Sequence, residues 1–71
     1  MNKFVITKIE MPANKSNNLE LIQRLYDFGF CPGLEVQVIG RVSFNSVIIV
    51  QYDTTRIALN EEEFSCLHGR S

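Results

Sequence analysis

The sequence predicts a small, mainly β protein: a barrel of about five strands, with one α-helix inserted after the first strand and a short helical turn near the C-terminus. Short runs rich in β-branched residues fill the second half of the chain, and close turns separate them. Only one early stretch has helical periodicity. At 71 residues, without a linker or an internal repeat, we expect a single domain over residues 1–71. Closing the sheet into a barrel would protect its edges from aggregation.

The first strand is expected over residues 3–9, which are rich in β-branched and aromatic side chains. Pro12 and a polar segment end it. Apolar side chains then recur at helical spacing, with polar ones on the other face; they are Leu19, Leu21, Ile22, Leu25 and Phe28. Asn17 is the expected N-cap, and Glu20, three residues later, completes a variant of the capping box.

The end of this helix carries the clearest turn signals in the chain. Gly29 suits the left-handed position after the last helical residue, and Phe30 can pack back on Leu25 as in a Schellman motif. Pro32 and Gly33 predict the centre of a type II turn, since Pro presets the first φ angle and Gly supplies the positive one.

The remainder reads as strands. We expect one strand over residues 35–42, with Gly40 marking a bulge or bend, and a loop over residues 43–46. A β-branched strand follows over residues 47–52, and a turn over 53–55 leads to a strand over 56–59. Asn60 and the three glutamates after it predict a short, N-capped helical turn. Residues 66–68 form the expected fifth strand.

Charge and hydropathy exclude several classes of protein. Seven Lys and Arg residues against eight Asp and Glu residues leave a net charge of −1, which argues against nucleic-acid binding because that requires a basic stripe. The longest apolar run, residues 47–50, is far shorter than the ~20 residues of a membrane-spanning helix. The N-terminus has no signal-peptide pattern, and two cysteines are fewer than small secreted domains usually have. We therefore expect a cytoplasmic protein with reduced thiols and no membrane insertion.

The segment Arg24-Leu25-Tyr26-Asp27-Phe28-Gly29-Phe30-Cys31-Pro32-Gly33 resembles the helix-to-strand signature of the FeoA family, ferrous iron transport protein A. The resemblance continues through residues 36–38 and Arg41, resumes at Arg56-Ile57-Ala58-Leu59, and reaches Phe64 and Leu67. It covers about residues 4–68. Two segments depart from the family pattern. Residues 43–47 replace a Pro-Leu-Gly-Asp-Pro loop, with Asn45 able to take a left-handed conformation, and residues 60–63 are acidic where basic residues are common.

The resemblance implies an SH3-like barrel with a helical insertion. It also implies a small cytoplasmic accessory protein of ferrous iron uptake, which binds the cytosolic part of the membrane GTPase transporter FeoB and modulates its assembly or activity. FeoA-like domains also occur in metal-dependent repressors, but this chain has no room for a DNA-binding domain. Whether it changes GTP hydrolysis stays open: Arg24, Arg41, Arg56 and Arg70 are all chemically suitable as an arginine finger.

Catalytic residues are not expected. The chain has a single histidine, His68, and no sequence pattern pairs it, as a base, with a nucleophile and an orienting acid. No Gly-rich phosphate loop is present, and no cofactor is predicted. The three glutamates after Asn60 are interpreted as a solvated helix face. The protein is therefore predicted not to be an enzyme.

A metal site is the first alternative. Cys31, Cys66 and His68 are the only soft or imidazole ligands, and Cys66 and His68 would share one face of a strand. Since isolated cysteines are commonly buried as small apolar residues, we predict no metal site. The alternative is a sensor that binds ferrous or another transition metal ion directly. A further alternative is a nucleic-acid-binding barrel, which the acidic balance disfavours.

Partner binding is the preferred hypothesis, and four residues are candidates for it. Phe44 is an aromatic side chain in a polar loop, where no local packing explains it. Tyr26 on the flank of the helix, Arg24 and Arg41 are the other candidates. Leu25 and Phe28 are assigned to the core. Self-association, through the edge or loop of the second and third strands, remains open.

Overall fold

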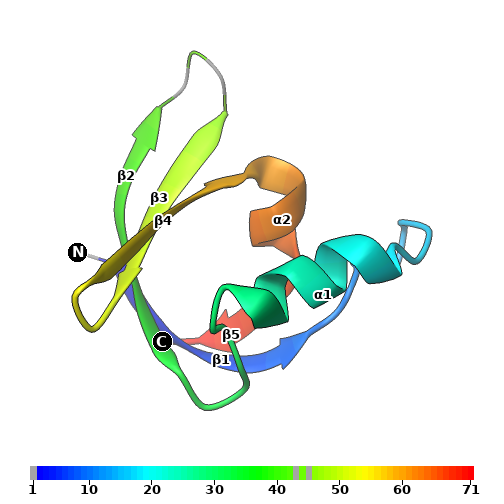
Figure 1. Cartoon of the computed structure of the whole chain (residues 1–71), viewed down its shortest axis with the longest axis horizontal. Coiled ribbons are helices and arrows are strands. Elements are labelled where there is room, and N and C mark those ends of the chain that lie inside the picture. Colours follow the sequence, from blue (N-terminus) through cyan, green and yellow to red (C-terminus); the bar gives the residue numbers. More distant parts are fainter. Residues whose placement is uncertain (1, 43, 45) are drawn as a thin grey trace.

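The computed structural model describes residues 2–42, 44 and 46–71. In chain order, its elements are β1 (Asn2–Ile9), α1 (Leu19–Asp27), β2 (Glu35–Val42), β3 (Val47–Tyr52), β4 (Thr55–Asn60), α2 (Glu61–Ser65) and β5 (Leu67–Arg70). This confirms the predicted order of one strand, a helix, three strands, a helical turn and a last strand (Figure 1).

The five strands form one antiparallel sheet in the order β4-β3-β2-β1-β5. The sheet curls around the two helices, which lie on its concave side (Figure 1). This architecture is a small SH3-like barrel, as predicted, but the sheet does not close on itself. Because α2 follows β4 without a loop, it carries the chain across the open side, so that β5 pairs with β1 and β4 remains an edge.

The core lies between the curled sheet and α1. Leu21 and Leu25 are the buried side chains of α1, and they are four residues apart on one helix face. The largest fully buried side chains come from the sheet, from α1 and from the residues that follow the C-terminal ends of α1 and α2. They are Ile6, Leu25, Phe30, Val36, Val50, Leu59 and Cys66. Phe30 packs edge-to-face on Tyr52, with ring centroids 5.6 Å apart.

The C-terminal end of α1 confirms both turn predictions. The N–H of Gly29 donates to the carbonyl of Tyr26, the N–H of Phe30 donates to that of Leu25, and Gly29 has φ +100°, which together make a Schellman motif. In the next turn, the N–H of Leu34 donates to the carbonyl of Cys31 and Gly33 has φ +95°, as a type II turn requires.

The N-terminal end of α1 corrects the predicted cap. Asn18, not Asn17, is the N-cap, and its side-chain oxygen accepts a hydrogen bond of 3.1 Å from the N–H of Leu21. Two adjacent asparagines have equal capping propensity, so the register of the buried pair Leu21 and Leu25 decides between them.

Two further expectations are wrong in detail, and one is confirmed. Cys66 is the C-cap of α2 and not a strand residue, so β5 begins at Leu67. Phe28 is 36% exposed, because it is the C-cap of α1 and lies beyond the last buried helical turn. Gly40 does mark a bulge: the register between β2 and β3 shifts between Val38 and Gly40.

Candidate protein-binding surface

The hairpin of β2 and β3 extends beyond the rest of the barrel (Figure 1), and its turn contains an aromatic residue, Phe44. Phe44 is 96% exposed, and Val42, the last residue of β2, is 42% exposed. Covering a Phe side chain of this kind contributes about 1.5–3 kcal/mol to association. The predicted left-handed conformation of Asn45 falls outside the described residues.

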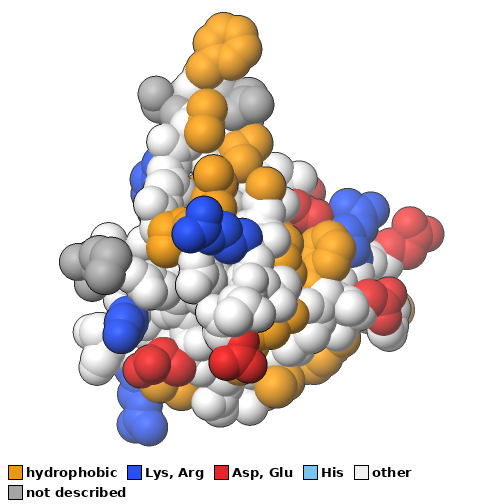
Figure 2. All heavy atoms as spheres, turned by 60° about the vertical axis from the view of Figure 1, so that its left-hand side comes forward, with side chains coloured by type: hydrophobic (Ala, Val, Ile, Leu, Met, Phe, Trp, Pro, Cys, Tyr) orange, Lys and Arg blue, Asp and Glu red, His pale blue; other side chains and the backbone are white. Residues whose placement is uncertain are grey.

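The apolar surface continues down one face of the hairpin. Val42 pairs with Val47 in the sheet. Since neighbouring strand residues point to opposite faces, Val47 and Ile49 lie on the side of β3 opposite the buried Ile48 and Val50. Val42, Phe44, Val47 and Ile49 together are called the hairpin surface here. Figure 2 shows orange side chains that run along the hairpin to its tip.

Arg41 lies on the other face of the same hairpin. It pairs with Ile48, and its guanidinium carbon is 5.7 Å from the ring centroid of Phe64 in a cation–π contact. The Phe64 ring in turn packs edge-to-face on Phe4, with centroids 6.1 Å apart. Arg41 therefore helps to attach α2 to the sheet, and it remains exposed on the face of the hairpin opposite the hairpin surface.

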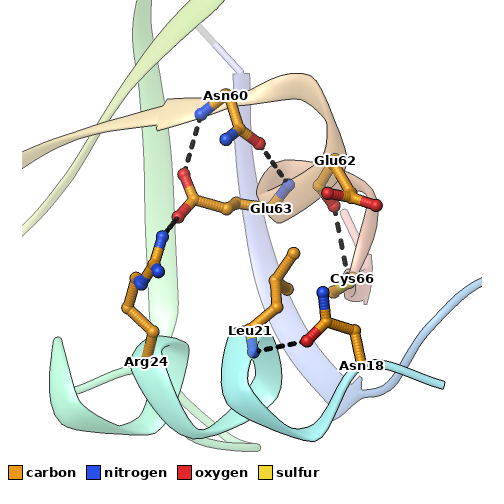
Figure 3. Close-up of polar contacts among 7 residues, drawn as sticks. All are labelled: Asn18, Leu21, Arg24, Asn60, Glu62, Glu63 and Cys66. Atoms are coloured by element: carbon orange, nitrogen blue, oxygen red, sulfur yellow. Dashed lines mark hydrogen bonds and ion pairs between the residues drawn. The ribbon is translucent and has the colours of Figure 1, made fainter.

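Arg24 makes a structural contact between the two helices. Its Nη1 lies 3.1 Å from Oε2 of Glu63, while Oε1 of the same carboxylate accepts a hydrogen bond of 3.0 Å from the N–H of Asn60 (Figure 3). The Asn60 side chain accepts in return from the N–H of Glu63 at 2.7 Å, which completes a capping box. Glu63 is only 6% exposed, so the interpretation of all three glutamates as a solvated face is wrong for this one.

Comparison with known proteins assigns this barrel to a family. A family model described as the FeoA domain matches residues 2–70. The chain belongs to the FeoA family. Membership implies a role in ferrous iron transport, and the family is one of small accessory domains and not a known family of enzymes.

A solved structure has a similar fold. A Pseudomonas aeruginosa protein, determined by NMR in solution, superposes with a TM-score of 0.68 and 25% sequence identity. The match covers 97% of this chain and 87% of that one. No curated protein matches the chain.

In this FeoA chain, the predicted partner-binding residues fall on two separate elements. Phe44 and Arg41 belong to the β2–β3 hairpin, whereas Arg24 and Tyr26 belong to α1. Tyr26 is 45% exposed. Phe44 and Arg41 thus share one hairpin but not one face of it, Tyr26 lies on another element, and Arg24 forms an ion pair with Glu63.

Leu19 is an exposed apolar residue that the sequence analysis placed in the apolar stripe of the helix. It is 78% exposed. Leu19 is two positions before the buried Leu21, and two residues correspond to about 200° around a helix, so the two side chains face opposite ways. The spacing to Leu21 could have revealed this.

The three candidate metal ligands of this FeoA chain lie in different environments. Cys31 is exposed in the turn after α1, and Cys66 is buried. The Cys66 thiol lies 3.3 Å from Sδ of Met11 and 3.4 Å from the carbonyl oxygen of Glu62, and burial raises its pKa. The ring Nε2 of His68 is 2.9 Å from the carbonyl oxygen of Glu10. Among residues 2–42, 44 and 46–71, no three His, Cys, Asp or Glu side chains gather to hold a metal ion.

In the part of the FeoA chain that the structure describes, neither helix combines the length and the apolar character needed to cross a membrane.

Proposed function

We propose that this FeoA protein is a cytoplasmic accessory protein that binds the cytosolic part of a FeoB-like membrane GTPase transporter and modulates its assembly or activity. The family assignment supports a role in ferrous iron transport. The observation that carries the docking proposal is the 96% exposure of Phe44 at the end of a protruding hairpin.

The hairpin surface has the features of a small binding anchor. Aromatic residues dominate the energetics of protein interfaces when a partner encloses them. Val42 and Val47, which flank the turn that holds Phe44, are paired in the sheet, so the backbone on either side of this turn is already ordered before a partner binds. The net charge of −1 supplies no strong electrostatic attraction, which leaves shape and apolar contact as the main sources of affinity.

The arginines favour modulation by docking over direct participation in GTP hydrolysis. An arginine finger must be free to reach the phosphates. Arg24 pairs with Glu63, Arg41 lies over the ring of Phe64, and Nε of Arg56 donates to Gln51 at 2.9 Å. Arg70 is exposed on β5.

The proposal is tested by measuring the affinity of purified wild-type protein and of Phe44→Ala for the cytosolic region of the FeoB GTPase from the same organism. We expect Phe44→Ala to bind at least about tenfold more weakly, because an anchor worth about 1.5–3 kcal/mol is removed. Its free energy of unfolding should change by less than about 0.5 kcal/mol, as for other exposed sites.

Leu19→Ala is the matched control, since it also removes an exposed apolar side chain, but from α1. It should bind as the wild type does. Equal affinities for wild type and Phe44→Ala would contradict the proposed docking surface. Failure of the wild-type protein to bind the FeoB region at all would contradict the proposed function.

A further inference from the structure

The second feature with the geometry of an interface is the free edge of β4. Among the strands that the structure describes, β4 has β3 on one side and none on the other. Such an edge presents backbone N–H and C=O groups that can pair with another extended chain.

The groups on this edge can be identified from Asn60. Its N–H donates to the Glu63 carboxylate and not to β3, so the backbone groups of Asn60 point away from the sheet. Along a strand in an antiparallel pair, residues alternate between those bonded to the neighbour and those that face away from it. Ala58 and Arg56, two and four positions earlier, therefore also direct their N–H and C=O groups outward. Both residues are exposed.

The Glu63 side chain closes the C-terminal end of this edge, because its carboxylate accepts a hydrogen bond from the N–H of Asn60. The open part of the edge consists of Arg56 and Ala58, with two donors and two acceptors.

We propose that β4 pairs in antiparallel orientation with β4 of a second copy of this chain, about a two-fold axis at Ile57. Arg56 of each copy then lies opposite Ala58 of the other, and each such pair exchanges two N–H···O=C hydrogen bonds. All the outward groups of Arg56 and Ala58 become satisfied, and the Asn60–Glu63 capping box stays intact. The edge is thus complementary to itself, as an interface with two-fold symmetry requires.

The side chains fit this arrangement. The antiparallel order places the Arg56 end of each edge beside the acidic end of the other, where Glu61 follows Asn60. The charges at the two ends are therefore complementary, while Nε of Arg56 keeps its hydrogen bond to Gln51.

This pairing goes beyond the proposed function and does not depend on it, because Phe44 and Val42 lie on the β2–β3 hairpin and not on the β4 edge. A dimer formed in this way would retain two free hairpin surfaces. With four backbone hydrogen bonds and little buried area, we expect it to be weak and to form at high protein concentration.

The test compares sedimentation equilibrium of the wild type, Ala58→Pro and Ala58→Thr over a range of protein concentrations. Proline is tolerated in edge strands where the missing N–H faces solvent, so Ala58→Pro should fold. It removes two hydrogen bonds from the symmetric pair and should raise the dissociation constant at least about tenfold. Ala58→Thr retains the N–H and should dimerise like the wild type.

Hydrogen exchange of the wild-type protein gives a second test that needs no variant. The amides of Arg56 and Ala58 should become protected as the concentration rises, whereas those of Ile57 and Leu59, which point to β3, should not change. The proposal is overturned by a wild type that stays monomeric up to its solubility limit, by assembly that continues beyond the dimer, or by a dimer that Ala58→Pro retains in full.

Discussion

The Glu63 side chain connects α2, β4 and α1. One carboxylate oxygen accepts from the N–H of Asn60, the other pairs with Arg24, and the residue is 6% exposed (Figure 3). A buried carboxylate is tolerated only when it is paired and hydrogen-bonded. The sequence could predict the capping box, but not the ion pair, because Arg24 is 39 residues away along the chain.

Replacing Glu63 should therefore reveal both roles. We expect Glu63→Ala to lower the free energy of unfolding by about 2 kcal/mol, since it removes a cap and leaves Asn60 and Arg24 without their acceptor. Glu63→Gln should lose less, because its amide oxygen can still accept from the N–H of Asn60. Arg24→Ala, which removes a half-exposed partner, should lower it by no more than about 1 kcal/mol. Urea denaturation measures all three, and equal losses would contradict this division of roles.

The thiol of Cys66 links stability to pH. Burial is the largest cause of its raised pKa; the negative charges of Glu62 and Glu63 also raise it, and a hydrogen bond with Ser65 opposes them. The folded protein therefore holds this proton more tightly than the unfolded chain, in which a cysteine thiol has a pKa of about 8.5. The contribution to stability is complete below that pH and is lost as the pH rises above it.

Between about pH 7.5 and 9.5, the urea midpoint of the wild type should thus fall more steeply than that of Cys66→Ala. Cys31→Ala is the control, because Cys31 is exposed, and it should keep the wild-type slope. If all three proteins showed the same slope, Cys66 would not be the group responsible.

Among the elements, α1 shows best what a sequence can and cannot determine. Its C-terminal end was predictable, because Gly29, Phe30 and Gly33 each have a local conformational reason for their position. The N-terminal end of α1 could not be predicted to the residue, because Asn17 and Asn18 have the same side chain and are equally suitable as an N-cap. Phe28 was misplaced for a related reason: helical spacing does not say where the last buried turn ends.

The N-cap assignment can be tested with two matched variants. Asn18→Ala should lower the free energy of unfolding by about 1 kcal/mol, since it removes the acceptor for the N–H of Leu21. Asn17→Ala, one residue earlier in an exposed segment, should have an effect below about 0.5 kcal/mol. Thermal or urea denaturation measures both variants. If Asn17→Ala lost more free energy of unfolding than Asn18→Ala, Asn17 would be the N-cap and the assignment to Asn18 would be wrong.

At the scale of the whole molecule, the strand order depends on contacts between distant residues. The alternating and β-branched runs predict the strands themselves, but not that β5 pairs with β1 and leaves β4 open. Nor does the sequence show that the β2–β3 hairpin extends beyond the barrel. Phe44 is a candidate from the sequence only because it stands in a polar loop; its 96% exposure, and the pairing of Val42 with Val47 beside it, are tertiary facts.

The central claim is that the hairpin surface docks on the FeoB transporter, and NMR of isotope-labelled protein titrated with the FeoB cytosolic region tests it most directly. The account predicts that the largest changes in chemical shift occur at Val42, Phe44, Val47 and Ile49, with small changes in α1. Changes that centre on Leu19 and Tyr26 of α1, with the hairpin resonances unmoved, would contradict it.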